Sequence, residues 1–279
     1  VMVVILVILC ATCVVPFIHL LAKSVSSNTA VLAKRVSFWP IGFNLDAYTS
    51  IFEYGSMVRS FLYSVVVTLV FTLMGMIACT CAAYPLSRKR LKGRTFFTFI
   101  LMFPMYFSAG LIPTYLLYSD LHMLDTVWVL ILPLIYAPYN MLIMKTYFQS
   151  NIPDSLEEAA FLDGATNFQI IWKIVLPLSK PILATLSLFY AVGRWNSYAD
   201  NKYYIRSEGL KMVQYKLSQL VSSASEAQTA QLSGEVVVTS TPEVLQAACI
   251  MFVTIPIICV YPFLQKYFVK GVMIGAVKG

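Results

Sequence analysis

The chain has 279 residues, of which 59% are hydrophobic and only 12% are charged, and its formal net charge is +7. This composition excludes an ordinary soluble domain, in which about a quarter of the residues are charged, and it indicates a protein that contacts membrane lipids. The positive charge does not call for a nucleic-acid partner, because basic residues at the flanks of membrane spans account for it.

Six apolar stretches are long enough to cross a bilayer, since about 20 helical residues span a hydrocarbon core of about 30 Å. The sequence therefore predicts an all-α polytopic membrane protein whose six transmembrane helices cover residues 1–22, 60–87, 95–119, 126–148, 181–199 and 244–265. The first stretch lacks the basic start and the cleavage pattern of a signal peptide, so we expect it to be retained. We also expect a short cytosolic segment before Val1.

Basic residues crowd the short connection between the second and third stretches, at Arg88, Lys89, Arg90, Lys92 and Arg94. Loops rich in Lys and Arg stay in the cytosol, because burying each charge in the bilayer costs about 2.5–3.5 kcal/mol. Counting from this loop, we expect both termini and the loop 150–180 to be cytosolic, and the loop 200–243 to be extracytoplasmic. Within the outer loop, the run SSASEAQTA (222–230) predicts a flexible polar stretch.

The cytosolic loop reads as a helix, a turn and a second helix. Pro153 and Asp154 are typical of a first helical turn, and Gly164 is expected to end that helix. Thr166 opens a capping-box pattern for a second helix, and Pro177 is expected to stop it.

The first helix of this loop has one distinctive face, formed by Leu156, Ala159, Ala160 and Asp163 at three- and four-residue spacing. A helix of about ten residues is marginal alone in water, so it needs a surface to dock on. That surface belongs either to the membrane helices of this chain or to a groove of another protein.

Several kinds of chemistry have no support in the sequence. There are only two histidines, and the six cysteines fall inside apolar stretches, so we expect no metal site and no catalytic residues. No phosphate-binding pattern G-x-x-x-x-G-K-[ST] occurs, so the chain is expected to bind no nucleotide cofactor and not to be an enzyme.

The cytosolic loop resembles the EAA loop of permease subunits in ATP-binding cassette (ABC) importers. That signature is E-A-A, three residues, G, nine residues, and I-x-L-P; here it reads Glu158-Ala159-Ala160, Gly164 and Ile174-Val175-Leu176-Pro177. The segments FWPIGFNLDAYTSIF, GRWNSY and YFVKGVMIGAVKG extend the resemblance to MalG-type carbohydrate permeases, and within these to the branch for oligosaccharides and polysaccharides.

The resemblance implies a type I ABC importer permease (MetI/MalG-like) fold in the cytoplasmic membrane of a bacterium. It implies a heterodimer with a second, homologous permease, two cytosolic ATPase subunits that use ATP and Mg, an extracytoplasmic solute-binding protein and a carbohydrate substrate. The ATPase-coupling residues that it implies are Glu157, Glu158, Ala159, Ala160, Asp163, Gly164, Ile174, Leu176 and Pro177. The tail Val269 to Gly279 is expected to make a second, smaller contact with the ATPase.

Polar and aromatic residues inside two of the apolar stretches are candidates for a substrate path, because sugars bind aromatic faces, amides and guanidinium groups. These residues are Tyr136, Asn140, Tyr190, Arg194, Trp195 and Asn196. The alternative is an aromatic belt at the membrane interface, with Arg194 extended outward to water.

Two other transport functions are alternatives to this interpretation. An ABC permease for amino acids or peptides has the same loop, but the MalG-like segments oppose it. A secondary transporter usually carries acidic residues inside its spans, and the six apolar stretches contain none.

Overall fold

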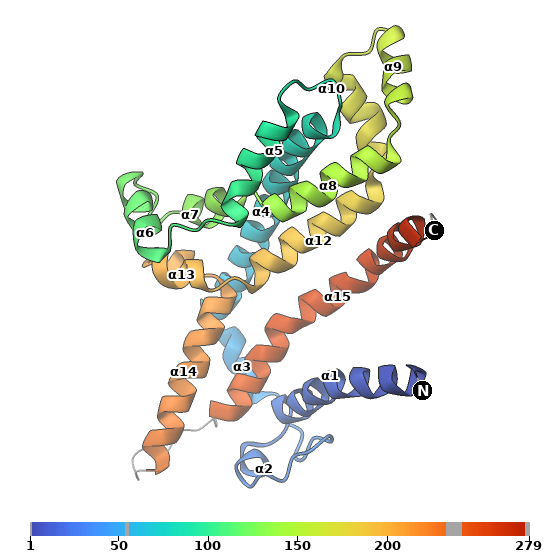
Figure 1. The fold of residues 1–279 in the computed structure, drawn as a ribbon. Coiled ribbons are helices and arrows are strands. Elements are labelled where there is room, and N and C mark those ends of the chain that lie inside the picture. The colour runs from blue at the N-terminus through green and yellow to red at the C-terminus, as the bar shows by residue number, and fades with distance from the viewer. Residues whose placement is uncertain (1, 54–55, 233–241, 277–279) are drawn as a thin grey trace. The chain divides into compact units, whose positions relative to one another are not determined.

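The computed structural model describes residues 2–53, 56–232 and 242–276, and within these ranges the regular structure is helical, with no strand. This confirms the all-α prediction. The chain forms two compact units: Val1–Ser64 with Ser207–Cys259, and Val65–Arg206 with Val260–Gly279. Figure 1 labels the helices along the chain.

Among the described residues, the first unit contains five complete helices and parts of two long ones. They are α1 (Met2–Ser24), α2 (Asn28–Leu32), α3 (Asp46–Glu53), the start of α4 (Ser56–Ser87), the short η4 (Glu208–Leu210), α14 (Val213–Leu232) and the first part of α15 (Pro242–Ala276). An ion pair between Lys23 and Glu243 joins α1 to α15. The Ser64 Oγ accepts a 2.8 Å hydrogen bond from the Val213 N–H, which caps the start of α14 against α4.

The stretch 222–230, expected to be flexible, is helical and belongs to α14. That expectation was wrong because the stretch is rich in Ala and also contains Glu and Gln, all of which have high helix propensity. The rest of the outer loop at 233–241 lies outside the described residues.

The second unit consists of the main part of α4, a run of shorter helices and the end of α15. The shorter helices are α5 (Arg94–Met102), η1 (Phe103–Met105), α6 (Leu111–Asp120), α7 (Val127–Ile131), η2 (Leu132–Leu134), α8 (Pro138–Asn151), α9 (Asp154–Leu162), α10 (Asn167–Ile170), the π-helical η3 (Ile171–Val175), α11 (Leu176–Leu178), α12 (Lys180–Asn196) and α13 (Ala199–Tyr204).

Among the described residues, three helices have the length and apolarity of an unbroken span: Met2–Ser24, Ser56–Ser87 and Glu243–Val260. Two bent pairs pass the same test as single spans, Val127–Leu134 with Pro138–Asn151 at 46° and Asn167–Leu178 with Lys180–Asn196 at 85°. The expected span 95–119 is interrupted between Met105 and Leu111; Pro104 lies in η1 just before the break and Gly110 at its end. The expected number of six crossings stays a prediction.

The core of the second unit lies where α4, α8 and α12 meet. Met141, Met144 and Phe148 of α8 and Leu186 of α12 are fully buried. Figure 1 shows α8 and α12 side by side, with α9 and α10 in the connection between them. The core therefore supports the two ends of the loop that carries α9 and α10.

The second helix of this loop ends close to Pro177, as expected. The helical run Asn167–Leu178 passes through the π-helical turn η3 into α11 and ends one residue after Pro177. A bend of 85° at Ser179 then separates it from α12.

Candidate functional site

The α9 helix has the boundaries expected from the sequence. Pro153 is its extended N-cap residue, and Asp154 and Glu157 stand in the first turn, where acidic groups complement the helix dipole. At the other end Gly164 has a φ of +80°, its N–H donates to the Phe161 carbonyl at 3.0 Å, and the N–H of Ala165 donates to the Ala160 carbonyl at 2.9 Å. This is a Schellman ending, and it confirms the expected turn.

The next helix begins with the expected capping box. The Thr166 hydroxyl accepts from the Gln169 N–H at 3.3 Å, and the Gln169 side chain accepts from the Thr166 N–H at 2.9 Å. The end of α9 and the start of α10 are therefore joined by a short turn, and hydrogen bonds close both helix ends.

Arg88, the first residue after α4, holds the start of α9. Its side chain is only 4% exposed; Nη1 donates to the Ile152 carbonyl at 3.1 Å and to the Asp154 carboxylate at 3.3 Å. Nη2 forms an ion pair with Glu157 at 2.9 Å, and the Glu157 side chain is only 5% exposed. The sequence identified Arg88 only as a topology signal, and its partners lie more than 60 residues away.

Arg90 makes a second link from the same loop. Its guanidinium lies 4.6 Å from the centre of the Phe161 ring, and Nη2 donates to the Asn167 side chain at 2.6 Å. Arg88 therefore holds the start of α9, and Arg90 contacts one residue on each side of the turn between α9 and α10.

The predicted coupling residues on α9 divide between two faces. Glu157 and Ala160 are buried against the protein. Glu158, Ala159 and Asp163 are exposed on the opposite side, as is Leu162, of which 91% is accessible. Of the four residues expected to share one face, Ala160 is buried against this chain, and Leu156, Ala159 and Asp163 are exposed.

An apolar surface continues beyond the turn. The Phe168 and Trp172 side chains are 73% and 65% exposed, and their rings stack with centres 6.3 Å apart. Of the predicted residues that follow, Ile174 and Leu176 are half-buried and Pro177 is exposed. Large apolar groups on a segment that is polar elsewhere are typical of a contact surface.

The candidate substrate-path residues are mostly packed inside the second unit. The Tyr136 hydroxyl donates to the Leu101 carbonyl at 2.9 Å, and Asn140 is buried. The buried Tyr190 ring contacts Phe71 edge to face at 5.8 Å, and it lies so close to Gly75 that a Cβ there would be 2.7 Å from the ring.

Arg194 is also buried, so the alternative in which its side chain extends outward to water does not hold. Its Nη1 donates to the Leu130 carbonyl at 2.8 Å, and its Nη2 forms an ion pair with Asp200 at 3.0 Å. Trp195 beside it is buried and Asn196 is exposed. These contacts hold α12 against its neighbours, and a substrate role for this group stays a prediction.

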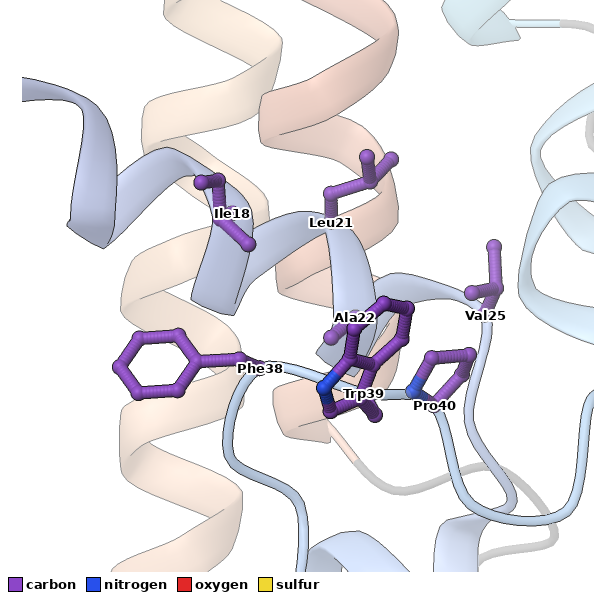
Figure 2. A pocket seen from close by; sticks show the side chains of 7 residues that line it. All are labelled: Ile18, Leu21, Ala22, Val25, Phe38, Trp39 and Pro40. Atoms are coloured by element: carbon purple, nitrogen blue, oxygen red, sulfur yellow. The ribbon is translucent and has the colours of Figure 1, made fainter.

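A separate cavity of about 520 Å³ lies in the first unit, between the end of α1 and the segment 38–40. Figure 2 shows that apolar side chains line it, namely Ile18, Leu21, Ala22, Val25, Phe38, Trp39 and Pro40. Such a lining offers few groups that bind sugar hydroxyls, so we assign no substrate to it. The tail Val269 to Gly279, which is expected to contact the ATPase, ends with residues 277–279, and these lie outside the described residues.

Comparisons with known proteins point to one class. A family model described as binding-protein-dependent transport system inner membrane component matches residues 72–274. The chain is 42% identical over 270 residues to the polygalacturonan/rhamnogalacturonan transport system permease protein YtcP of Bacillus subtilis (strain 168), which covers 96% of this chain and 93% of the relative. It is 38% identical over 271 residues to protein LplC of the same strain, with coverages of 96% and 90%.

A solved structure gives the same result for the fold. It is the crystal structure of a bacterial ABC transporter involved in the import of the acidic polysaccharide alginate. One of its chains matches with a TM-score of 0.85 and 33% sequence identity, covering 95% of this chain and 94% of that chain. The expected permease fold is confirmed.

Proposed function

The chain belongs to the family of binding-protein-dependent transport system inner membrane components, and from this premise we propose that it is the permease subunit of an ATP-driven importer for an oligosaccharide or other glycan. The names of its relatives support the substrate class, since one is named for polygalacturonan and rhamnogalacturonan and the matching structure for alginate. We place the chain in the cytoplasmic membrane of a bacterium, with both termini in the cytosol.

The observation that carries the proposal is the exposed outer face of the loop from α9 to α10. Glu158 and Leu162 point away from the protein, and Phe168 and Trp172 add apolar surface beside them. A helix as short as α9 is not stable on its own, and its inner face already packs on this chain. The outer face is therefore suited to a cleft of a cytosolic partner.

The partners follow from what the chain lacks. It has no phosphate-binding loop, so we assign ATP and Mg to two cytosolic ATPase subunits and no cofactor to this chain. A second, homologous permease completes the pathway, and an extracytoplasmic solute-binding protein delivers the sugar. Closing of the ATPase pair moves the docked loops together, and the helices attached to them alternate the access of the pathway between the two sides.

The coupling residues have distinct roles in this proposal. Glu158 makes the charged contact with the ATPase, and Ala159 allows close approach. Glu157 and Ala160 support the helix from its inner side, where both are buried. Gly164 supplies the left-handed turn that lets α10 follow at once.

Charge reversal at the outer face tests the proposal. Glu158→Lys is expected to reduce the amount of ATPase that co-purifies with the permease pair by at least tenfold, while the amount of this chain in the membrane stays the same. Glu53→Lys is the matched control, because Glu53 is also an exposed acid but lies at the end of α3. Full retention of the ATPase by Glu158→Lys would contradict the docking role.

A further inference from the structure

Arg88 is buried, although the sequence placed it in a water-exposed cytosolic loop. A buried guanidinium is costly unless its charge is paired; here Nη1 donates the hydrogen bonds, and Nη2 is paired with Glu157 by charge at 2.9 Å without hydrogen-bond geometry. All the polar partners that Arg88 contacts, which are the Ile152 carbonyl, Asp154 and Glu157, lie in the segment that enters α9. The ring of Tyr84 on α4 lies beneath it, with its centre 5.3 Å from the guanidinium carbon.

These contacts fix the rotation of α9 about its own axis. Asp154 and Glu157 are three residues apart and share one face of the helix, whereas Glu158 points about 100° away from Glu157. The ion pair with Arg88 holds Glu157 on the inner face of α9. Glu158 and Leu162 therefore lie on the outer face.

The same contacts join α9 to α4. Arg88 directly follows the last residue of α4, which is one continuous helix from Ser56 to Ser87. Phe71 of α4 contacts both Tyr190 and Arg194, and Gly75 lies against Tyr190. The 17 residues from Phe71 to Arg88 correspond to about 25 Å of helix. This continuous helix, which contains Pro85, therefore links the loop to the candidate substrate-path residues.

We propose that Arg88 is a positioning residue with two effects: it sets the rotation of α9 that presents Glu158 outward, and it passes the displacement of α9 to α4 and so to Tyr190 and Arg194. The inference rests on the proposed docking of this loop to an ATPase. It gives the loop a lateral connection to α4 besides its covalent connections to α8 and α12 (Figure 1).

The geometry requires arginine in particular. Two different nitrogens of the guanidinium contact two carboxylates and a carbonyl, and both carboxylates belong to the first turn of α9. A lysine ammonium has one nitrogen and no planar fork. Arg88→Lys is therefore expected to keep only part of the transmission, although it keeps the charge.

A spin label on α4 tests the transmission in the assembled complex of both permeases and the ATPases. The label is attached to Cys81, which is exposed on α4, after the other five cysteines are replaced. The probe is ATP with Mg and vanadate, so no sugar is needed. We expect the trapped complex to change the line shape of the label in the parent protein, and this change to fall at least fivefold in Arg88→Gln and in Glu157→Gln.

The matched control is Lys92→Gln, which removes one positive charge from the same loop at an exposed position. Lys92→Gln is expected to keep the full change, and Arg88→Lys an intermediate one. If Arg88→Gln does not reach the membrane, Glu157→Gln decides the question, because it removes the ion pair and leaves the Arg88 bond to Ile152 intact. A parent without any nucleotide-dependent change, or a Glu157→Gln protein with the full change, would overturn the inference.

Failure of this inference differs from failure of the proposed function. If Glu158→Lys retains the ATPase, docking through the outer face is wrong whatever Arg88 does. If Glu158→Lys releases the ATPase while Arg88→Gln keeps both the ATPase and the full signal at Cys81, only the role of Arg88 is wrong.

Discussion

Arg88 and Arg194 are both buried in the second unit, and each contacts a backbone carbonyl and at least one carboxylate, but their carboxylate partners lie in different places. Each donates to a backbone carbonyl 64 residues away, Arg88 to Ile152 and Arg194 to Leu130. The carboxylate partner of Arg194 is Asp200, only a few residues further along the chain, whereas Arg88 pairs with Asp154 and Glu157 of a distant helix. Both arginines therefore join separate parts of the unit, but the ion pair of Arg194 stays at the end of its own helix, whereas the ion pairs of Arg88 reach α9.

The difference also lies in what surrounds each pair. Arg194 and its neighbours Tyr190 and Trp195 are packed within the protein. Beyond the Arg88 pair, α9 presents an exposed outer face with Glu158 and Leu162. An arginine of the first kind stabilises the fold, and one of the second kind also sets the direction of a surface that another protein can use.

The largest expected effect concerns the turn at Gly164, next to the exposed outer face of α9. Gly164→Asp is expected to abolish ATPase binding, with at least a tenfold loss on co-purification, although no described residue of this chain lies within 4 Å of a Cβ at Gly164. The loss then comes from a clash and a negative charge in the partner's cleft. Gly110→Asp is the matched control, because Gly110 also has a positive φ and open space around it.

Both glycine variants carry backbone strain, and Gly110→Asp carries the larger one, because Gly110 has a φ of 86° and a ψ of 175°, a region essentially restricted to glycine. Equal losses of ATPase in Gly164→Asp and Gly110→Asp would show that strain, and not docking, is responsible. If Gly164→Asp retains a wild-type amount of ATPase, the turn at Gly164 is not part of the docking surface.

The next effect concerns the packed side. Arg194→Gln leaves Asp200 without its buried ionic partner, and breaking such a pair costs about 3–5 kcal/mol. We expect a clear fall in the thermal unfolding temperature of the purified complex. Arg206→Gln is the control, because Arg206 is exposed and its side chain bonds the Tyr115 hydroxyl at 3.2 Å. An Arg194→Gln protein of normal stability that fails to transport sugar would instead favour a direct substrate contact.

A smaller effect is expected where α4 and α12 approach most closely. A Cβ at position 75 would lie 2.7 Å from the Tyr190 ring, so Gly75→Ala forces the helices apart and costs about 1–3 kcal/mol. Gly193→Ala on α12 meets nothing within 4 Å, and we expect no loss of stability there. Thermal unfolding of the two variants measures the difference, and equal unfolding temperatures would contradict the close packing.

The smallest effect concerns an exposed ion cluster, which contrasts with both buried arginines. Hydrogen bonds from Lys211 and Lys216 lower the pKa of Glu208 below its ordinary value of 4.5. The stability from this cluster is present above the ordinary pKa and is lost as the pH falls through the lowered one. Because the Glu208 side chain is 66% exposed, we expect Glu208→Gln to lower the unfolding temperature only slightly at pH 7 and not at all at low pH.

Local patterns in the sequence predicted the local structure of the candidate site well. The start of α9 after Pro153, the left-handed turn at Gly164 and the capping box at Thr166 depend on neighbours within a few residues, and all three are confirmed. The end of the second helix is predicted to within one residue by Pro177, but the π-helical turn before it is not predicted. The break in the expected span 95–119 was missed because an apolar run shows length but not continuity.

Long-range pairing was beyond the sequence. Glu157 and Glu158 are adjacent and chemically alike, and only the position of Arg88 shows that one is buried and the other exposed. The inward direction of Ala160 and the burial of Arg194 have the same cause, because both depend on segments far away in the chain. One signal of this pairing was available. Asp154 and Glu157 are spaced to share one helix face, and the basic cluster from Arg88 to Arg94 is expected on the same side of the membrane.

Cross-linking from α9 to the ATPase tests the central claim most directly. In the assembled complex, a cysteine at Leu162, which is 91% exposed, is expected to cross-link to an ATPase subunit, and a cysteine at Ala160, which is 8% exposed, is not. A cross-link from position 160 without one from position 162, or no cross-link to the ATPase from either position, would contradict the account.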